Sequence, residues 1–499
     1  VANGATLLVS GGLSGLTDPI FLNGPGVGNN GSLLVQGTNK LSGLVTLSTS
    51  SEIGADSGAT LTLAGGVSGT NVDVTFDGAG NILASGAISL GTGGVTKQGA
   101  GVTTLSSASN AYTGATTITL GELTLSGSGS IPDTSAVSVT GTFNMDSVSD
   151  TVGSITGAGT ISLGSATLTS GSAGTTSFSG AITGTGNIIK TGSATTLTLS
   201  GTNTYSGTTT IAADGGNLTV SGTLGTSSSY AGNVVITSST STFTFSNATS
   251  GTTQTLSGVI SGDGIVAKSG ASTLKLSGSS DNTYTGATNV TAGVLSVAKN
   301  VALGTTAGIT AVSGTGAVHF DGSGLSISEP FTIAASGSGT GALLNLANNN
   351  TVTGAVTLSA AATIGSTAGT LTFNVSSDNA FDATSGTPAI TFTGAGNITV
   401  SDPIDTPIST FTKSGTGVFL TEAVNAYTGS TTISAGTLRL SGSGSIPDSS
   451  AVSVTGSGIY DLNSVSDTVG SISSSGSSTS AMTGDACGRT TTGSDFAEP

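Results

Sequence analysis

The stretch KQGAGVTTLSSASNAYTGATTITLGELTLSG, residues 97–127, contains the pattern that decides the fold. In its second half, Ile118 and Leu120 alternate with threonines. After a two-residue interruption, the alternation resumes with Leu123 and Leu125. A period of two residues is typical of a β-strand with one buried face. Because the interruption moves the apolar set from even to odd positions, the pattern predicts two short strands, with all four apolar residues inward and a corner between them.

The same unit occurs four times along the chain, each time with a Lys at its start and Asn-x-Tyr near its centre. The chain has only nine Lys and Arg and six Tyr, so this alignment is not a coincidence of composition. The structural repeat positions are Lys97, Asn110, Tyr112, Lys190, Asn203, Tyr205, Lys268, Asn282, Tyr284, Lys413, Asn425 and Tyr427. Positions shared by every repeat report on the scaffold, so we expect the Tyr to pack at a corner while Asn and Thr satisfy backbone groups. The alternative is a row of sugar-stacking tyrosines.

Short strands separated by Gly, Asn, Ser and Asp recur along nearly the whole chain, and no segment shows a sustained helical stripe. Sandwiches and propellers usually carry larger aromatic cores, but only 4% of these residues are aromatic. A parallel β-solenoid tolerates Ser, Thr, Asn and Gly because its coils are held by stacked small side chains and coil-to-coil hydrogen bonds. We therefore predict an all-β parallel β-helix (β-solenoid), one elongated rod of about 20 coils.

A longer duplication surrounds the short unit. The segment that starts GSLLVQGTNKLSG at Gly31 matches the segment that starts GALLNLANNNTVTG at Gly341. This match predicts four parts, which are a first repeat block at 1–155, a middle section with two Lys–Tyr units at 156–315, a second copy of the block at 316–480 and an irregular tail at 481–499.

Composition narrows the class of partner. The formal net charge is −16 with only nine Lys and Arg, which argues against binding to nucleic acid. No apolar run reaches the ~18 residues of a membrane helix, so we expect no membrane insertion by this chain. The mean hydropathy of +0.29 argues against a disordered chain. Cys487 is the only cysteine and allows no internal disulfide.

Catalytic patterns are missing from the sequence. Pectin-degrading β-helices use Asp-Asp, Gly-His and Arg-x-Lys phrases, and none of the three occurs. His319 is the only histidine, and one His with the nearby Asp321 does not make a triad. Arg439 stands where the first repeat has Thr124, so we expect an outward surface side chain. We therefore expect no enzyme activity and no catalytic residues.

Two acidic loops could each touch a calcium ion. Asp402 and Asp405 lie in SDPIDTP, and Asp378 and Asp382 lie in SSDNAFDATSG. Hard-cation sites need about six or more oxygens, so solvated turns are the favoured interpretation. We expect no metal and no other cofactor.

The pattern K-x-G-x-G-x-x-x-L-x-L-S-G-x-N-x-Y-[ST]-G-x-T-x-I-x-x-G-x-L-x-L resembles the autotransporter-associated β-strand repeat of Gram-negative passenger regions. The lead-in phrases at Ser179–Gly192 and Leu256–Gly270 resemble that repeat as well. The resemblance implies a passenger or part of one, located outside the cell or on the outer surface of a Gram-negative bacterium. It says little about activity.

We expect a non-enzymatic structural rod, stalk or adhesive fibre, whose partner is a host or matrix glycan or a protein surface. One alternative is an extracellular filament subunit that stacks end to end, because Ala5–Gly24 corresponds to Gly316–Ile333 and the pattern at Val1 is already under way. The other alternative is a carbohydrate-active β-helix enzyme. We also expect residues 1–480 to be part of a longer rod or to self-associate through their ends, and the tail at 481–499 to be poorly ordered.

Overall fold

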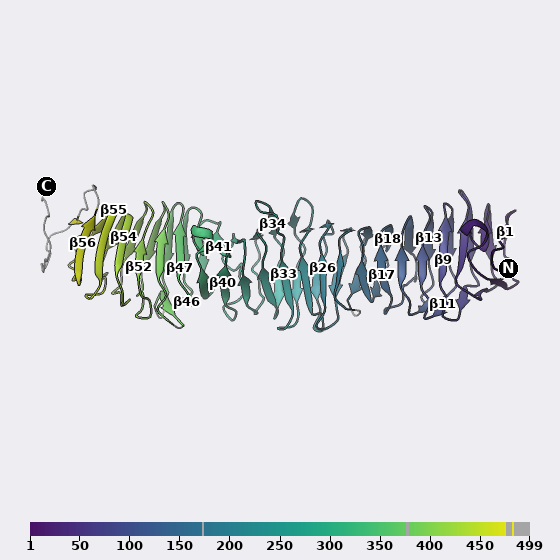
Figure 1. Ribbon diagram of the computed structural model, residues 1–499, viewed down its shortest axis with the longest axis horizontal. Coiled ribbons are helices and arrows are strands. Elements are labelled where there is room, and N and C mark those ends of the chain that lie inside the picture. The colour runs from purple at the N-terminus through teal and green to yellow at the C-terminus, as the bar shows by residue number, and fades with distance from the viewer. Residues whose placement is uncertain (172–173, 376–378, 385, 476–481, 484–499) are drawn as a thin grey trace. The chain divides into compact units, whose positions relative to one another are not determined.

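The computed structural model describes residues 1–171, 174–375, 379–384, 386–475 and 482–483. These residues form 57 β-strands and two short 3-10 helices, η1 (Val27–Asn29) and η2 (Gly337–Gly339). The chain divides into two compact units, unit 1 (Val1–Thr244) and unit 2 (Phe245–Pro499). In each unit, successive strands stack in parallel (Figure 1). The expected parallel β-solenoid is confirmed, with about 21 turns in the two units together.

Three sheets run through the first part of unit 1. The first contains β1 (Leu7–Val9), β3 (Leu33–Val35), β6 (Ser51–Ala55), β9 (Val74–Gly78), β12 (Val95–Lys97), β15 (Thr116–Ile118), β17 (Ala136–Val139) and β20 (Ser154–Thr156). The second contains β4 (Thr38–Leu41), β7 (Thr60–Leu63), β10 (Asn81–Ala84), β13 (Val102–Leu105), β16 (Glu122–Leu125), β18 (Thr142–Asn144), β21 (Thr160–Ser162) and β24 (Ala181–Thr183). The third contains β2 (Ile20–Leu22), β5 (Val45–Leu47), β8 (Val67–Gly69), β11 (Ile88–Gly91) and β14 (Ala111–Tyr112).

The second part of unit 1 continues in the same way. One sheet contains β19 (Asp150–Val152), β22 (Thr167–Ser170), β25 (Asn187–Lys190), β28 (Thr209–Ile211) and β32 (Val234–Ile236). Another contains β23 (Thr176–Phe178), β26 (Thr196–Leu199) and β29 (Asn217–Val220). The remaining strands are β27 (Thr202–Asn203), β30 (Thr223–Leu224), β31 (Ser229–Tyr230) and β33 (Thr242–Phe245).

Unit 2 is built from two main sheets. The smaller contains β36 (Ile265–Lys268), β38 (Thr288–Val290), β40 (Thr310–Gly314), β43 (Phe331–Ala335), β46 (Val356–Leu358) and β49 (Phe381–Ala383). The larger contains β34 (Thr253–Leu256), β37 (Thr273–Leu276), β39 (Val294–Val297), β41 (Ala317–Phe320), β42 (Ser326–Ile327), β44 (Leu343–Asn345), β45 (Asn349–Val352), β47 (Ala362–Ser366), β48 (Thr370–Phe373), β50 (Ile390–Thr393), β51 (Asn397–Val400), β52 (Phe411–Lys413), β53 (Val418–Thr421), β54 (Thr431–Leu440), β55 (Ala451–Asp461), β56 (Ser471–Ser475) and β57 (Met482–Thr483). The short strand β35 (Ile260–Gly262) precedes β36.

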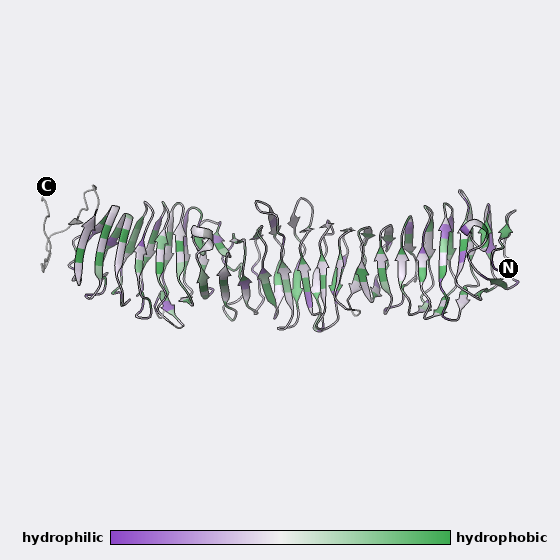
Figure 2. Ribbon diagram, viewed as in Figure 1, coloured by the Kyte–Doolittle hydropathy of each residue, from purple (hydrophilic) through white to green (hydrophobic). Residues whose placement is uncertain are grey.

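Alternating burial follows from the period-two sequence. In β7, Leu61 and Leu63 are fully buried while the two threonines beside them are half-buried. Figure 2 shows apolar residues recurring on successive strands in each unit. Each coil therefore contributes a few aliphatic side chains to a continuous interior, and fully burying one such side chain stabilises the fold by about 1.5–3 kcal/mol.

The corner in the opening stretch is present, but the expected direction of one side chain is wrong. Ile118 ends β15 and Leu123 and Leu125 lie in β16, and all three are buried, as expected. Leu120 lies between these strands and is 57% exposed. Its carbonyl oxygen turns inward and accepts a hydrogen bond from the Lys97 ammonium at 3.3 Å. Because the backbone is turned so that this carbonyl faces the interior, the Leu120 side chain points to solvent.

Unit 2 has a larger aromatic interior than the low aromatic content suggests. The ring centroids of Phe373 and Phe381 lie 4.7 Å apart, those of Phe392 and Phe419 lie 4.5 Å apart, and Phe411 stacks on Tyr427 at 5.6 Å. Aromatic pairs at such distances contribute about 0.5–1.5 kcal/mol beyond burial of their area. The few aromatic residues are therefore concentrated where they reinforce neighbouring coils.

The longer duplication is visible in the order of strands. The five strands β3 to β7 and the five strands β44 to β48 occupy matching stretches of the two aligned segments. Near the C-terminal end, β57 pairs in parallel with Tyr460 and Asp461 of β55. The other residues of the expected tail at 481–499, including Cys487, lie outside the described residues.

Candidate functional site

The repeated lysines are interior side chains, contrary to what is usual for this residue type. Lys97 is 2% exposed and ends β12 with its side chain inward. Its Nζ donates to the carbonyl oxygens of Gln98 at 2.6 Å, Gly99 at 2.7 Å and Leu120 at 3.3 Å. The first two oxygens belong to the turn that follows the lysine, and the third belongs to the next coil. One ammonium group thus ties a turn to the coil stacked on it.

The other three lysines make the same contacts. Each donates to the carbonyls of the two following residues and to one carbonyl of the next coil. The next-coil contacts are Lys190 Nζ to Gly215 O at 2.9 Å, Lys268 Nζ to Ala292 O at 3.1 Å and Lys413 Nζ to Ala435 O at 3.2 Å. Lys190 also donates to Thr195 Oγ1 at 2.7 Å.

Burial lowers the pKa of all four lysines to about 8. Desolvation disfavours the charged form of an interior amine, and Coulombic attraction to Asp77 and Asp214 offsets part of this for Lys97 and Lys190. Below that pKa the groups remain ammonium ions with three donors each, which suits a nest of carbonyl oxygens.

A glycine follows each next-coil carbonyl that accepts from a lysine. Gly121, Gly216, Gly293 and Gly436 have φ angles of 67°, 59°, 65° and 68°. This left-handed conformation, which L-residues with a Cβ adopt reluctantly, turns the preceding carbonyl toward the lysine. The glycine of the I-x-x-G-x-L phrase is therefore a partner of the lysine that lies one coil earlier.

The repeated asparagines link three consecutive coils. Asn110 Oδ1 accepts from the Ile88 N–H at 2.9 Å, and its Nδ2 donates to Ser130 O at 2.8 Å. In the other three repeats, the asparagine Oδ1 also accepts from a backbone N–H. The pairs are Ile182 N to Asn203 at 3.2 Å, Ile260 N to Asn282 at 3.0 Å and Ile404 N to Asn425 at 3.0 Å. The equivalent donations go to Thr223 O, Ala302 O and Ser445 O. One side-chain amide thus satisfies a backbone donor of the coil before it and a backbone acceptor of the coil after it.

The repeated tyrosines are buried, and each hydroxyl contacts the Thr four residues later. Tyr112 OH lies 2.9 Å from Thr116 Oγ1, which in turn lies 3.0 Å from Ser135 Oγ of the next coil. Ser135 then donates to Gly114 O at 2.9 Å. The other pairs are Tyr205–Thr209, Tyr284–Thr288 and Tyr427–Thr431. Burial raises the pKa of all four phenols. Their rings face the interior, so they do not form an exposed stacking surface.

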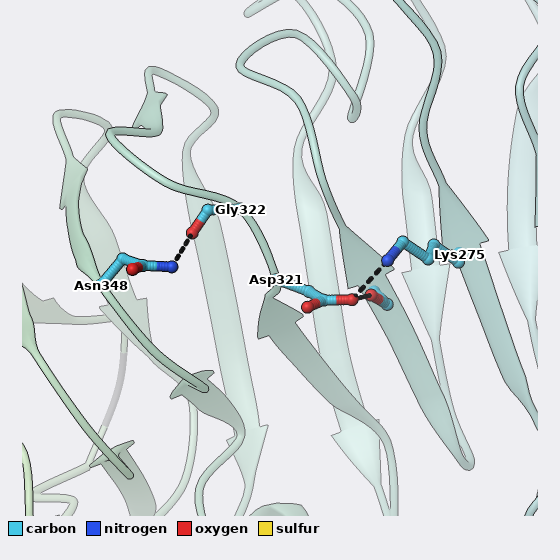
Figure 3. Close-up of polar contacts among 5 residues, drawn as sticks. Lys275, Asp321, Gly322 and Asn348 are labelled. Carbon is cyan, nitrogen blue, oxygen red and sulfur yellow. Dashed lines mark hydrogen bonds and ion pairs between the residues drawn. The ribbon is translucent and has the colours of Figure 1, made fainter.

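Lys275 and Asp321, two residues of types that enzymes use in catalysis, form an ion pair on the outside of unit 2. Lys275 Nζ lies 2.7 Å from Asp321 Oδ2, which also accepts from Ser296 Oγ at 3.2 Å (Figure 3). His319 stands beside Ser296 in the strand register, and its pKa is lowered by burial, with Asp321 acting in the opposite direction. The two charged partners are 33% and 38% exposed, so the pair contributes little to stability. No hydrogen bond joins His319 to Ser296 among the contacts of the described residues.

The remaining candidates from the sequence include two acidic loops on neighbouring coils, because Phe381 forms a parallel bridge with Ile404 and its carbonyl accepts from the Asp405 N–H at 3.0 Å. Arg439 is 44% exposed and pairs with Asp461 at 2.7 Å. Asp402 accepts from the Val375 N–H at 2.5 Å. Asp382 accepts from the N–H of the next residue, and Asp378 lies outside the described residues. Within the described ranges, no three His, Cys, Asp or Glu side chains gather in a way that would hold a metal ion.

Sequence reasoning missed several polar residues of the interior. Asn39 and Asn350 act like the repeat asparagines, since their Oδ1 atoms accept from Leu13 N and Leu325 N at 2.9 Å. Asp150 takes a similar position two coils beyond Asn110, where it accepts from Ile131 N at 3.0 Å. Asn39 and Asn350 lie in the two matching segments that start at Gly31 and Gly341. A closer alignment of those two segments is the signal that would have found them.

Comparison with known families identifies the repeat. The profile of the family described as Passenger-associated-transport-repeat matches residues 95–128, 188–220, 266–297 and 411–440. The four units are passenger-associated-transport-repeats. These repeats are the units with the recurring Lys, Asn and Tyr, and they belong to the class of autotransporter passenger repeats that the motif resembles. The family implies a secreted or surface protein.

Comparison with curated proteins and with solved structures gave no match. In the part of the chain that the structure describes, no helix has the length and apolar character to cross a membrane.

Proposed function

We propose that the chain is a non-enzymatic structural segment of a surface passenger, a stalk or adhesive fibre located outside a Gram-negative cell. The observation that carries the proposal is the use of the repeat residues. All four repeated Lys and Tyr and three of the four repeated Asn are buried, Asn110 is partly exposed, and each of these residues bonds to a neighbouring turn or coil. The repeat thus supplies joints between coils, and a chain of such joints can be extended by adding coils.

The outward residues support contact with a polar, uncharged partner. In the first sheet of unit 1, the outward positions Thr75, Thr96, Thr117 and Ser138 form a row across neighbouring strands, and all are partly exposed. Rows of hydroxyl groups on the outside of a sheet offer hydrogen bonds without strong charge, which suits a glycan or a polar protein surface of a host or matrix. The net charge of −16 disfavours polyanions.

The proposal is tested by display on a Gram-negative cell through an outer-membrane anchor fused after Pro499, with an epitope fused before Val1. We expect the epitope to lie farther from the membrane, by fluorescence interference, than the same epitope on the anchor alone. An epitope at the same height in both proteins would contradict a stalk.

Product release from pectins or glucans that is lost on Asp321→Ala, Asp402→Ala or Asp405→Ala would favour the enzyme alternative instead. Cell clumping that depends on the displayed chain would favour end-to-end self-association.

A further inference from the structure

Glu329 is a carboxyl side chain in the interior of unit 2. It stands one residue before Pro330, where β43 is about to begin, and is 4% exposed. Its Oε1 lies 3.4 Å from Thr310 Oγ1, at the long end of the hydrogen-bond range. Its Oε2 is buried and has no hydrogen-bond partner among the described residues. A carboxyl group held by one long hydrogen bond is poorly solvated for an ion.

The surroundings of Glu329 offer no compensating positive charge. The strands around it, β38, β40, β43 and β46, have no Lys, Arg, His, Asp or Glu along their described lengths. Tyr284 is a titratable residue that interacts with Glu329: burial raises the pKa of Tyr284, its Thr288 hydrogen bond lowers that pKa, and the Glu329 charge raises it further. The approach of the next coil is close, since a Cβ on Gly354 would lie 2.0 Å from Glu329 O.

The row of polar side chains that starts in the third repeat (residues 266–297) ends differently from the rows of the first and fourth repeats. In the first and fourth repeats, the Tyr–Thr–Ser chain of hydroxyls ends on a backbone carbonyl, Gly114 O or Gly429 O. In the third repeat, Tyr284 contacts Thr288 at 2.6 Å, Thr310 is the register partner of Thr288, and Glu329 lies beyond Thr310. A carboxyl group therefore stands at the end of this polar row, where the others have a backbone acceptor.

An uncompensated carboxylate is costly inside a protein, and the usual outcome is that the group keeps its proton. We propose that Glu329 is an interior proton-binding site that is neutral in the folded solenoid under mildly acidic conditions, and that its ionisation weakens the coils around it. Burial, opposed in part by the Thr310 hydrogen bond, raises the pKa of Glu329 from 4.5 to about 7. Because the pKa is higher in the folded state, the stabilising effect of the proton is complete below pH 4.5 and is lost as the pH rises through about 7.

The first test is hydrogen exchange of the full chain at pH 5.5 and 8.5, corrected for intrinsic exchange rates. In the wild type, we expect the opening equilibrium of amides in residues 310–335 to increase by at least about tenfold at the higher pH. In Glu329→Gln, which is neutral at both values, the increase is expected to vanish. The matched control is Glu422→Gln, because the partly exposed Glu422 carboxyl accepts from Ser401 at 2.8 Å. Equal pH dependence in the wild type and Glu329→Gln would overturn the proposal.

The second test does not require the Glu329→Gln variant to fold. Glu52 and Glu329 are the two buried glutamates of the described residues, so Glu52→Gln leaves Glu329 as the remaining one. With carbon-13-labelled glutamate in the Glu52→Gln protein, we expect an infrared carbonyl band of a protonated carboxyl at pH 5.5 that disappears by pH 8.5. Absence of that band at pH 5.5 would show that Glu329 is ionised, and the proposal would be wrong.

Discussion

Gly436→Ala is expected to destabilise the surrounding coils of unit 2 by about 4 kcal/mol or more, the largest effect of any single change considered for this chain. The φ angle of Gly436 is 68°, in the left-handed region that an alanine adopts at a cost of roughly 1–2 kcal/mol. A Cβ there would also lie 2.4 Å from Gly417 O and 2.5 Å from Gly415 O. Both contacts are to backbone atoms of the preceding coil, which cannot move aside without breaking strand pairing.

The measurement is urea-dependent hydrogen exchange of residues 411–440, which reports local stability in a chain whose coils need not unfold together. Gly442→Ala is the matched control, because Gly442 has a φ of 62° but no atom within 4 Å of an added Cβ. We expect about 1–2 kcal/mol for the control, from backbone strain alone. Equal losses in the two variants would show that close packing of Gly436 on the preceding coil is not what requires glycine there.

Lys413→Met is expected to cost about 2–4 kcal/mol in the same coils. Methionine keeps much of the apolar stem but removes the donors to Ser414 O, Gly415 O and Ala435 O, which lie 2.8, 2.8 and 3.2 Å from Nζ. These carbonyls then lose charge-assisted hydrogen bonds in a site where Lys413 is only 3% exposed. Lys40→Met is the control, because Lys40 is an exposed lysine on β4, and its replacement is expected to change stability by less than about 0.5 kcal/mol.

The pH dependence gives this prediction a second readout. The pKa of Lys413 is lowered by burial to about 8 from 10.5, so the unfolded chain binds this proton more tightly than the folded chain. Stability contributed by this group therefore rises between pH 8 and 10.5 in the wild type and not in Lys413→Met. We expect the difference in exchange-derived stability between the two proteins to widen from pH 7 to pH 10. A difference that narrows would mean that the ammonium form is favoured inside the coil.

The fold was predictable because its signals are local and repeated. Alternation in the stretch around Ile118 and Leu123 predicts strands, and recurrence of the unit predicts stacking of like coils. Leu120 was the exception, because its direction depends on a contact with Lys97 in the preceding coil. A period-two pattern carries no information about which carbonyl a lysine in another coil will bind.

The candidate site was predictable in its positions and less so in its chemistry. Lys, Asn and Tyr were found because they recur, but nothing in the sequence around Lys97 indicates that its ammonium is buried among carbonyl oxygens. Gly121 acts together with Lys97, because its φ of 67° turns the Leu120 carbonyl toward the lysine. That angle is visible only in the structure. Glu329 lies outside the four repeat units, so no comparison between repeats would have drawn attention to it.

Small-angle X-ray scattering of the intact chain in dilute solution tests most directly whether its coils form one continuous rod. We predict the cross-section radius of a single coil and a maximum dimension on the order of 100 Å, from about 20 coils spaced ~4.8 Å apart. A compact particle with a radius of gyration near the ~23 Å expected for a globular chain of this length would contradict the rod.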